Sequence, residues 1–351
     1  MARNASLNAA KRAKQDEFYT QWVDIEREMN AYLEFDPDVF RGKTVLLPCD
    51  DPEWSNFTKF FALHFADFGL RKLISTSYAP GGETGPTRGR KFTLAREDVP
   101  EGRCIDVDHL TWEHLDGDGD FRSPEVTRLR DQADIVITNP PFSLFREYMA
   151  WLIEGGKKFA AIGNLNAITY KEVFPLIKAN QLWLGPTIGS GGRGFRVPDS
   201  YPANATGLSV DEHGNRLVQV NARWVTNIDH KRRHTPLHMM PMEHNVRFSR
   251  HSSVRAGYRH YDNYAAIEVP FTDAIPSDFD GVMGVPITFL DKFSPDQFEI
   301  VGRGEDIGWA RSEDCTFFTP TTLELQRLYE VSPRESGVVF SLADESRPGL
   351  E

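Results

Sequence analysis

A short apolar segment that runs into two consecutive prolines constrains the fold of this chain more than any other feature. Asp134–Thr138 reads DIVIT, which is typical of a buried strand, and Asn139-Pro140-Pro141-Phe142 follows it directly. A helical pattern then begins at Ser143 and continues to Glu154. Because a strand that ends in a sharp turn and leads into a helix is the basic unit of α/β proteins, this segment predicts a layered α/β fold.

Strand-like and helical segments alternate over much of the chain. The other predicted strands are Thr44–Cys49, Lys72–Ser77, Arg103–Val107, Lys158–Ile162, Gln181–Leu184 and Asn221–Asn227. The other predicted helices are Glu17–Leu33, Ser55–Ala66 and Lys171–Ala179. This alternation predicts a mainly parallel sheet with helices on both faces. Ligands bind such sheets at the carboxyl ends of the strands, so we expect Cys49–Pro52 and Asn139–Phe142 at one edge.

The alternation stops after Asp229. The following segment is first basic and then proline-rich, and it contains short strand-like runs at Ala266–Pro270, Gly284–Leu290 and Gln297–Val301. We therefore predict a first domain of residues 1–228 and a separate recognition region of residues 229–351, with an approximate boundary.

The charge of the chain is unevenly distributed. The net charge is −11, yet the segment from Arg223 to His260 contains eight Lys+Arg residues against two acids, a local charge of +6. The rest of the chain therefore carries −17. A concentrated basic segment on an acidic body is typical of an oriented contact with phosphate, although a solvated face without a partner has the same composition. The candidate phosphate-binding residues are Lys231, Arg232, Arg233, Arg247 and Arg250.

Composition excludes several classes of protein. The chain has 351 residues, of which 40% are hydrophobic and 26% charged, as in soluble globular proteins. No run of about 18 apolar residues occurs, so no membrane span is expected. The polar N-terminus lacks the apolar core of a signal peptide, and Cys49, Cys104 and Cys315 lie far apart, so a reducing, cytoplasmic setting is expected.

Two further patterns resemble ligand sites only superficially. Gly185–Tyr201 contains GSGGRGF, but no strand leads into it and no Lys-Ser/Thr pair follows, so we expect a long flexible loop rather than a phosphate cradle. His230, His234 and His238 are spaced by four, but Pro236 interrupts a helix there and no carboxylate or cysteine completes the set. We predict no metal site.

The tetrapeptide Asn139–Phe142 suits the chemistry of an exocyclic amine. The N6 amine of adenine is a poor nucleophile because its lone pair is delocalised into the ring. Two acceptors aimed at its N–H bonds, the Asn139 side-chain oxygen and the Pro140 carbonyl, localise that lone pair without a strong base. Pro141 has no N–H and a fixed φ, which keeps the Pro140 carbonyl rigid and uncontested. Phe142 offers a flat face on which a flipped base can stack.

The sequence resembles the EcoRI-type adenine-specific DNA methyltransferases over most of its length. The residues that carry the resemblance are Lys14–Gln21, Cys49–Phe57, Gly119–Ser123, Ile137–Tyr148, Asn164–Pro175, Trp224–Arg232, Tyr261–Val269 and Gly284–Gly302. The resemblance implies a Rossmann-like class I core that uses S-adenosylmethionine, followed by a C-terminal region that recognises DNA. It also implies double-stranded DNA as substrate, in a bacterium or a phage-infected host cell.

The resemblance assigns roles to particular residues. Phe18-Tyr19-Thr20 resembles the element that closes over the methionine end of the cofactor. Asp50, Asp51 and Pro52 resemble the cofactor loop after the first strand, and either carboxylate can be the main contact. Asp120-Phe121 resembles the pair that binds the cofactor's adenine, with Asp118 as an alternative to Asp120. Asn139, Pro140, Pro141 and Phe142 are the expected catalytic residues.

The sequence departs from many methyltransferases in two places. A glycine-rich turn is missing after the first strand, and the second strand ends in Ser75-Thr76-Ser77 without an acid, so the ribose contact is unassigned. Two rival interpretations are a methyltransferase that acts on RNA or a protein amide, and a non-catalytic DNA-binding protein of the same fold. The sequence leaves open the DNA recognition site, the oligomeric state and the existence of a cognate restriction endonuclease.

Overall fold

The structure is a computed structural model that divides into two compact units. It describes residues 19–79, 87–99, 105–187, 193–197, 207–211, 214–261, 264–303 and 337–342. Unit 1 comprises Met1–Val173 and Leu182–His230, and unit 2 comprises Phe174–Gln181 and Lys231–Glu351. The sequence does not predict the excursion of residues 174–181, which contains helix α6 (Phe174–Lys178) and joins unit 2 before the chain returns to unit 1.

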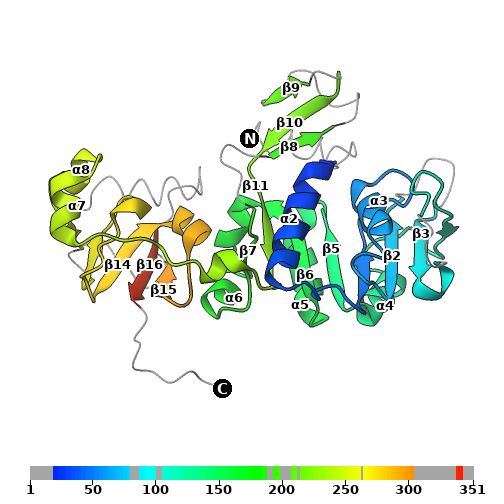
Figure 1. The fold of residues 1–351 in the computed structure, drawn as a ribbon, viewed down its shortest axis with the longest axis horizontal. Coiled ribbons are helices and arrows are strands. Elements are labelled where there is room, and N and C mark those ends of the chain that lie inside the picture. The colour runs from blue at the N-terminus through cyan, green and yellow to red at the C-terminus, as the bar shows by residue number, and fades with distance from the viewer. Residues whose placement is uncertain are drawn as a thin grey trace, which may run out of the picture. The chain divides into compact units, whose positions relative to one another are not determined.

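Unit 1 is built on a large mixed sheet. Its described strands have the order β4-β3-β2-β1-β5-β6-β11-β7 (Figure 1). They are β1 (Thr44–Leu47), β2 (Lys72–Ser77), β3 (Arg90–Ala95), β4 (Glu113–His114), β5 (Ile135–Thr138), β6 (Lys158–Asn164), β7 (Trp183–Leu184) and β11 (Ala222–Thr226). The four central strands are parallel and the flanking strands pair antiparallel. The predicted mainly parallel sheet is therefore correct for its centre and wrong for both flanks.

The central strands form from short β-branched and apolar runs. All four residues of β1 (TVLL) and all four of β5 (IVIT) are buried. Strand β1 pairs with both neighbours, since Val45 aligns with Leu73 of β2 and with Ile135 of β5. Because these strands are parallel and in register, their carboxyl ends meet at one edge of the sheet. This arrangement positions the polar residues that follow each strand.

Two helices of unit 1 begin at serine caps, and three of its helices bury aromatic side chains. Helix α3 (Asn56–Leu63) is capped by the Ser55 hydroxyl, which accepts from the Phe57 N–H at 3.1 Å. Helix α4 (Pro124–Gln132) is capped by Ser123 and has proline at its start, where no N–H is needed. The core around α2 (Trp22–Phe35), α3 and β11 contains Tyr32, Phe40, Phe57, Phe60, Phe61 and Trp224. Helix α5 (Phe145–Glu154) follows β5, as predicted.

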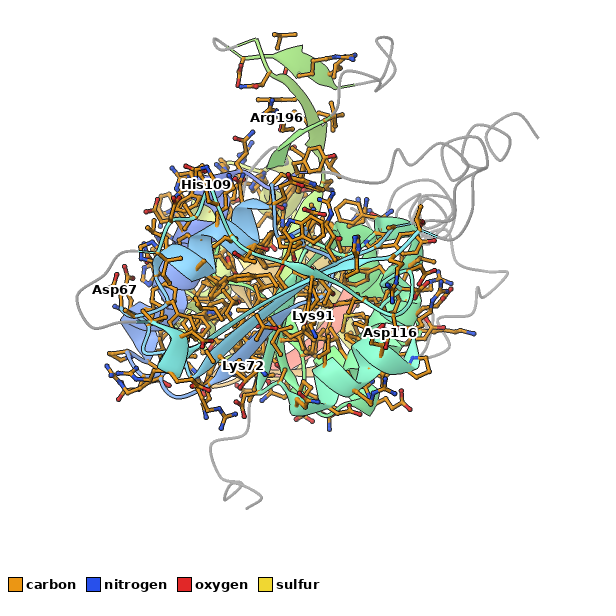
Figure 2. All side chains as sticks on the ribbon, turned by 90° about the vertical axis from the view of Figure 1, so that its right-hand side faces the viewer. Asp67, Lys72, Lys91, His109, Asp116 and Arg196 are labelled. Carbon is orange, nitrogen blue, oxygen red and sulfur yellow. The ribbon has the colours of Figure 1, made fainter. Side chains whose placement is uncertain are left out.

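A second, small sheet belongs to unit 1. It has the order β8-β10-β9, with β8 (Arg193–Arg196), β9 (Leu208–Val210) and β10 (Arg216–Val220), and all pairings are antiparallel. Strand β10 runs directly on into β11 of the large sheet (Figure 1). Arg196 is labelled on this sheet in Figure 2. The predicted loop Gly185–Tyr201 is therefore wrong at residues 193–196, which form an edge strand.

Unit 2 contains a sheet of its own. The described strands have the order β12-β13-β14-β16-β15, with β12 (Arg259–His260), β13 (Ala266–Glu268), β14 (Val282–Pro286), β15 (Phe298–Arg303) and β16 (Gly337–Leu342). Two short helices, α7 (Met242–Phe248) and α8 (Ser252–Arg255), precede the sheet. The predicted strand Gly284–Leu290 is wrong in its second half, because Ile287–Lys292 forms a 3₁₀ helix after Pro286.

The predicted and the observed local structure differ in two other places. Residues 105–107 of the predicted strand Arg103–Val107 are not in a strand. Strand β3 was not predicted, because its burial is irregular and gives no clear period of two. Among the described residues no helix is long and apolar enough to cross a membrane.

Candidate active site

The carboxylate of Asp50 lies buried between the ends of β1 and β5. Its Oδ1 accepts from the Ser55 hydroxyl at 2.8 Å, and its Oδ2 accepts from the Thr138 hydroxyl at 2.6 Å. Thr138 is the last residue of β5 and directly precedes Asn139. The hydrogen bond to Thr138 thus brings the loop after β1 and the Asn-Pro-Pro-Phe turn to the same edge of the sheet, as the sequence predicts.

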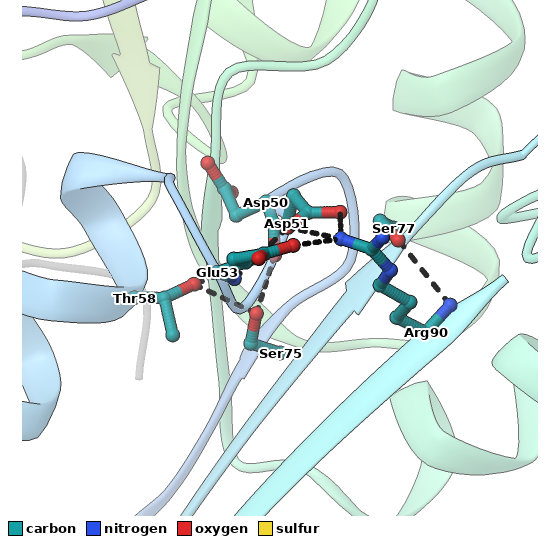
Figure 3. Close-up of polar contacts among 7 residues, drawn as sticks. All are labelled: Asp50, Asp51, Glu53, Thr58, Ser75, Ser77 and Arg90. Carbon is teal, nitrogen blue, oxygen red and sulfur yellow. Dashed lines mark hydrogen bonds and ion pairs between the residues drawn. The ribbon is translucent and has the colours of Figure 1, made fainter. Parts of the chain in front are cut away.

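The backbone of Asp50 is fixed as firmly as its side chain. Its N–H donates to the Thr76 carbonyl at 2.9 Å. Its carbonyl accepts from the Ser75 hydroxyl, which in turn accepts from the Thr58 hydroxyl at 2.7 Å (Figure 3). The end of β2 has no acidic residue, and its residues Ser75 and Thr76 instead hold the Asp50 backbone.

Burial controls the protonation of Asp50. The side-chain partners of Asp50 among the described residues are the hydroxyls of Ser55 and Thr138, and neither carries a charge. Burial raises the pKa of Asp50 from 3.8 to about 7, against the hydrogen bonds from Thr138 and Ser55, which favour the charged form. A cationic ligand beside Asp50 would favour the charged carboxylate and lower its pKa.

Asp51 is in a different electrostatic environment from Asp50. The Arg90 guanidinium from β3 lies 3.5 Å from the Asp51 carboxylate and also pairs with Glu53 (Figure 3). The Asp51 carboxylate also accepts from the Glu53 N–H at 2.9 Å. Arg90 is held in place by the Trp112 ring, whose centroid is 4.4 Å from the guanidinium carbon. Asp51 therefore already has a cationic partner.

The N-terminal residues Tyr19 and Thr20 lie beside the loop after β1. The Thr20 carbonyl accepts from the Asn56 side chain at 2.8 Å, and the Tyr19 ring packs edge-on against Trp54 with centroids 4.7 Å apart. The Thr20 hydroxyl is buried and has no hydrogen-bond partner among the described residues. The structure thus brings Tyr19, Thr20, Asp50 and the residues after it together, whereas Phe18 lies outside the described residues.

The four residues of the Asn-Pro-Pro-Phe turn connect β5 to α5. Pro140 is buried and the other three are partly buried. The Asn139 side-chain oxygen is buried, and Phe142 begins a short 3₁₀ turn that leads into α5. The Phe142 ring contacts Phe195 of β8, with centroids 6.3 Å apart and planes at 90°.

Asp120 and Phe121 already have partners within the protein. The Asp120 carboxylate accepts from the Arg122 guanidinium at 2.9 and 2.6 Å, and this hydrogen bonding lowers the pKa of Asp120. Phe121 is buried and packs edge-on against Tyr148 and Trp151, with centroids 5.0 and 5.6 Å apart. The turn is held near the end of β2, because the Ala79 N–H donates to the Asp118 carbonyl at 2.7 Å.

Glycine is required where this turn approaches β2. Gly119 has a φ of +82°, and a Cβ there would lie 2.1 Å from the Ser77 carbonyl oxygen. The close approach explains why a glycine precedes Asp120, and it fixes Asp118 and Asp120 at the same edge of the sheet as Asp50. It also accounts for the raised pKa of Tyr78, which results from burial and from the charges of Asp118 and Asp120.

The predicted basic cluster of unit 2 is not uniform. Lys231 and Arg232 are exposed, and the Arg232 side chain donates to the Asp291 carbonyl at 3.2 Å. Arg233 is buried and donates to the Asn180 side chain at 2.6 Å. Arg233 therefore holds unit 2 together, and Lys231 is the member of the cluster whose exposure best suits it to phosphate.

Helices α7 and α8 present a basic and aromatic surface. Arg247 and Arg250 are exposed, and Arg250 pairs with Asp273 at 2.9 Å. Phe248, at the end of α7, is 62% exposed. Its ring lies 4.7 Å from the His244 ring and 5.1 Å from the Arg247 guanidinium carbon. We call this set, His244, Arg247, Phe248 and Arg250, the α7–α8 surface.

Two of the three histidines singled out in the sequence bond to other groups. The His230 ring is buried and bonds the Leu184 carbonyl at 2.9 Å, and His234 pairs with Asp296 at 3.1 Å. Within the described ranges no three His, Cys, Asp or Glu side chains come together as a metal site.

Sequence reasoning missed several residues that form the site. Ser55 and Thr138 could have been found, because one is an N-cap residue and the other is a hydroxyl at the end of an apolar strand. Arg90 comes from strand β3, which was not predicted, so no local signal identified it. The exposed Phe248 follows an ordinary helical pattern and is recognisable only from its exposure.

The geometry and the comparisons with known proteins define the class of this protein. A mixed α/β sheet with an acidic loop after β1 and Asn-Pro-Pro-Phe after β5, at one edge, is consistent with a methyltransferase. The family model described as "Adenine-specific methyltransferase EcoRI" matches residues 6–329. The chain belongs to this family and is an adenine-specific DNA methyltransferase, as the resemblance predicts.

Curated relatives resemble the chain over most of its length. It is 46% identical over 310 residues to the type II methyltransferase M.EcoRI of Escherichia coli, covering 86% of this chain and 90% of that protein. It is 35% identical over 301 residues to the type II methyltransferase M.MpnI of Mycoplasma pneumoniae, covering 84% of each. No solved structure matches the chain.

Proposed function

We propose that this enzyme transfers a methyl group from S-adenosylmethionine to the N6 amine of an adenine that is flipped out of duplex DNA. The observation that carries the proposal is the 2.6 Å hydrogen bond between Asp50 and Thr138. It joins the acidic loop after β1 to the residue before Asn139, so a cofactor held by the loop and an amine held by the turn would be neighbours.

The residues after β1 fit S-adenosylmethionine. Asp50 is a buried carboxylate whose partners are hydroxyls, and the Thr20 hydroxyl is buried without a described partner. An ammonium group suits the first and a carboxylate suits the second. Since Asp51 is already paired with Arg90, Asp50 is the better contact for the ammonium. When bound, S-adenosylmethionine supplies an electrophilic methyl group on a positively charged sulfur.

The adenine end of the cofactor is assigned to the Gly119–Phe121 turn. Asp120 lies at the same edge of the sheet and can accept from an amine with a lone pair that Arg122 does not use. The Phe121 ring packs against Tyr148 and Trp151, so it supports the turn by packing. Asp118, whose side chain accepts from the Asp120 N–H at 3.0 Å, shapes the turn.

The chain's own residues orient the target amine. The Asn139 side-chain oxygen and the Pro140 carbonyl accept from the two N–H bonds of N6 and localise its lone pair. The Phe142 ring receives the flipped base by stacking, which offsets part of the cost of unstacking it, a few kcal/mol. These groups act by position, because neither an amide nor a peptide carbonyl titrates near neutral pH.

Unit 2 supplies the contact with DNA in this proposal, and the predicted domains correspond to catalysis (1–228) and recognition (229–351). Lys231, Arg247 and Arg250 are exposed cations that suit phosphate, whereas the buried Arg233 does not. The Phe248 ring offers an apolar contact for bases on the same surface. The setting we propose is the cytoplasm of a bacterium or a phage-infected cell. There the enzyme protects DNA from a cognate endonuclease or protects phage DNA.

One experiment tests the proposal directly. The protein is incubated with S-adenosylmethionine carrying a labelled methyl group and with duplex DNA, RNA or protein as acceptor. We expect label only in DNA, and only as N6-methyladenine after digestion to nucleosides. Label in RNA or protein would identify that acceptor, instead of DNA, as the substrate. DNA binding without any label would mean a non-catalytic protein. Methylome sequencing of a host that expresses the protein then gives the recognition site.

A further inference from the structure

Strand β8 contacts both halves of the proposed active site. The Tyr19 N–H donates to the Arg196 carbonyl at 3.0 Å, and the Arg196 N–H donates to the Tyr19 carbonyl at 3.1 Å. The neighbouring residue in the strand, Phe195, contacts the Phe142 ring. Tyr19 belongs to the side that would hold the cofactor, and Phe142 to the side that would hold the base. Adjacent residues of one strand therefore reach both sides.

The cofactor side of this connection is continuous. From Tyr19 the contacts run through the Trp54 ring and through the Thr20 carbonyl to Asn56, in the segment that follows Asp50 and Asp51. A ligand that orders this segment would order Tyr19 and Thr20. Because paired backbone N–H and C=O groups hold Tyr19 to Arg196, it would also fix the position of β8.

The base side of the connection depends on ring geometry. Phe195 is 1% exposed, so its ring is held by the core, whereas Phe142 is only partly buried. Perpendicular rings with centroids 6.3 Å apart are in direct contact, so no base fits between them. Phe195 thus limits the rotation of Phe142 and leaves the rest of the Phe142 surface for the base.

We propose that β8 is a coupling element in which Phe195 positions Phe142 and the Tyr19–Arg196 pairing transmits cofactor binding to the base-stacking ring. Phe195 is a positioning residue and touches neither substrate. The inference rests on the proposed function, since it takes Phe142 as the stacking partner of the target adenine. It gives the residues of the N-terminal segment a role in binding the base as well as the cofactor.

The coupling is measurable without turnover. Affinity for a duplex containing the recognition site is determined with and without saturating S-adenosylhomocysteine, and the ratio of the two dissociation constants is the coupling. We expect the ligand to tighten DNA binding by the wild type. Phe195→Ala should abolish this effect and lower kcat on the order of 100-fold, the scale of a small misplacement of reacting groups.

Val218 provides the matched control. It is the cross-strand partner of Phe195 in β10 and is equally buried in the small sheet, so Val218→Ala weakens the same packing. We expect Val218→Ala to lower stability but to keep the coupling and kcat. Phe195→Leu keeps most of the buried volume without a flat ring, so it should fold and still lose the coupling.

Two results would overturn the inference. One is a wild-type enzyme whose DNA affinity does not respond to S-adenosylhomocysteine. The other is a Phe195→Leu variant that matches Val218→Ala in coupling and kcat. Failure of the proposed function gives a different result, because the wild-type enzyme would then transfer no labelled methyl group to adenine. That result is obtained with the wild type alone, before any variant is compared.

Discussion

The loop after β1 in unit 1 and the α7–α8 surface of unit 2 hold their charged side chains in opposite ways. Asp50 is buried, and each of its oxygens is fixed by a hydroxyl. Arg247 and Arg250 are exposed on a short helical segment. Buried groups act through fixed geometry in a low dielectric, and exposed cations act through a field that salt screens. We therefore expect single changes in unit 1 to have large effects, and changes on the α7–α8 surface to have small, salt-dependent effects.

Asn139→Ala should show the largest effect. The variant removes one of two acceptors for the target amine and leaves the backbone of the turn in place. We expect kcat to fall by about 100- to 1000-fold, the loss seen when one preorganised hydrogen-bonding group is removed. Calorimetry with S-adenosylmethionine should give a wild-type dissociation constant. An equal loss of cofactor affinity and rate would instead place Asn139 in the cofactor site.

Asp50→Asn should change how the stability of the protein depends on pH. The folded-state pKa of about 7 lies above the ordinary value of 3.8, so the folded protein keeps a proton that the unfolded chain loses. Asp50 therefore contributes stability below pH of about 4 that is lost as the pH rises to about 7, at up to about 1.4 kcal/mol per pH unit. Asparagine does not titrate, so the variant should lack this slope.

Two measurements test this prediction about Asp50. Urea unfolding across pH 4 to 8 should show the variant gaining stability relative to the wild type as the pH rises. Calorimetry at pH 6.5 in buffers of different ionisation enthalpy should show that cofactor binding to the wild type releases a proton and that binding to Asp50→Asn does not. A pH-independent difference in stability would mean that Asp50 is charged in the folded protein throughout.

The same contrast explains what could be predicted from the sequence. The edge of the sheet was predictable, because β1 and β5 are short apolar runs and the polar residues directly follow them in the chain. The bond between Asp50 and Thr138 spans 88 residues, and no local pattern specifies such a contact. Strand β8 was missed because it is an edge strand in a glycine-rich segment, where hydrophobic alternation is weak.

The basic segment shows a different limit of prediction from the sequence. Its net charge was correctly located in the sequence, but charge alone does not say which cations are buried. Arg233 is covered by a partner on residues 174–181, which join unit 2 by an unpredicted excursion. Arg247 and Arg250 stay exposed, although the neighbouring helices α7 and α8 bury Asn245 and Val254.

Replacing both Arg247 and Arg250 with alanine should weaken DNA binding in proportion to the number of phosphates they neutralise. The slope of log affinity against log salt should shrink by up to about 0.9 for each phosphate that is no longer neutralised, for specific and random sequences alike. Lys157→Ala is the control. Lys157 directly precedes β6, so it lies at the edge of the large sheet opposite to Asp50. An unchanged slope in the double variant would mean that the α7–α8 surface lies outside the DNA interface. Arg233→Ala should instead reduce stability, because Arg233 is buried.

Phe248→Ala should have the smallest effect and the most specific one. The ring is 62% exposed, so its removal leaves little cavity and stability should hold. An apolar side chain among exposed cations can contact bases but not phosphate, so affinity for the recognition site should fall by up to about tenfold while the salt slope stays the same. Phe35→Ala is the matched control, because Phe35 is 41% exposed at the end of α2 in unit 1. Equal losses on specific and random DNA would mean that Phe248 only supports Arg247, on whose guanidinium its ring packs. A loss confined to the recognition site would mean that the α7–α8 surface reads sequence as well as charge.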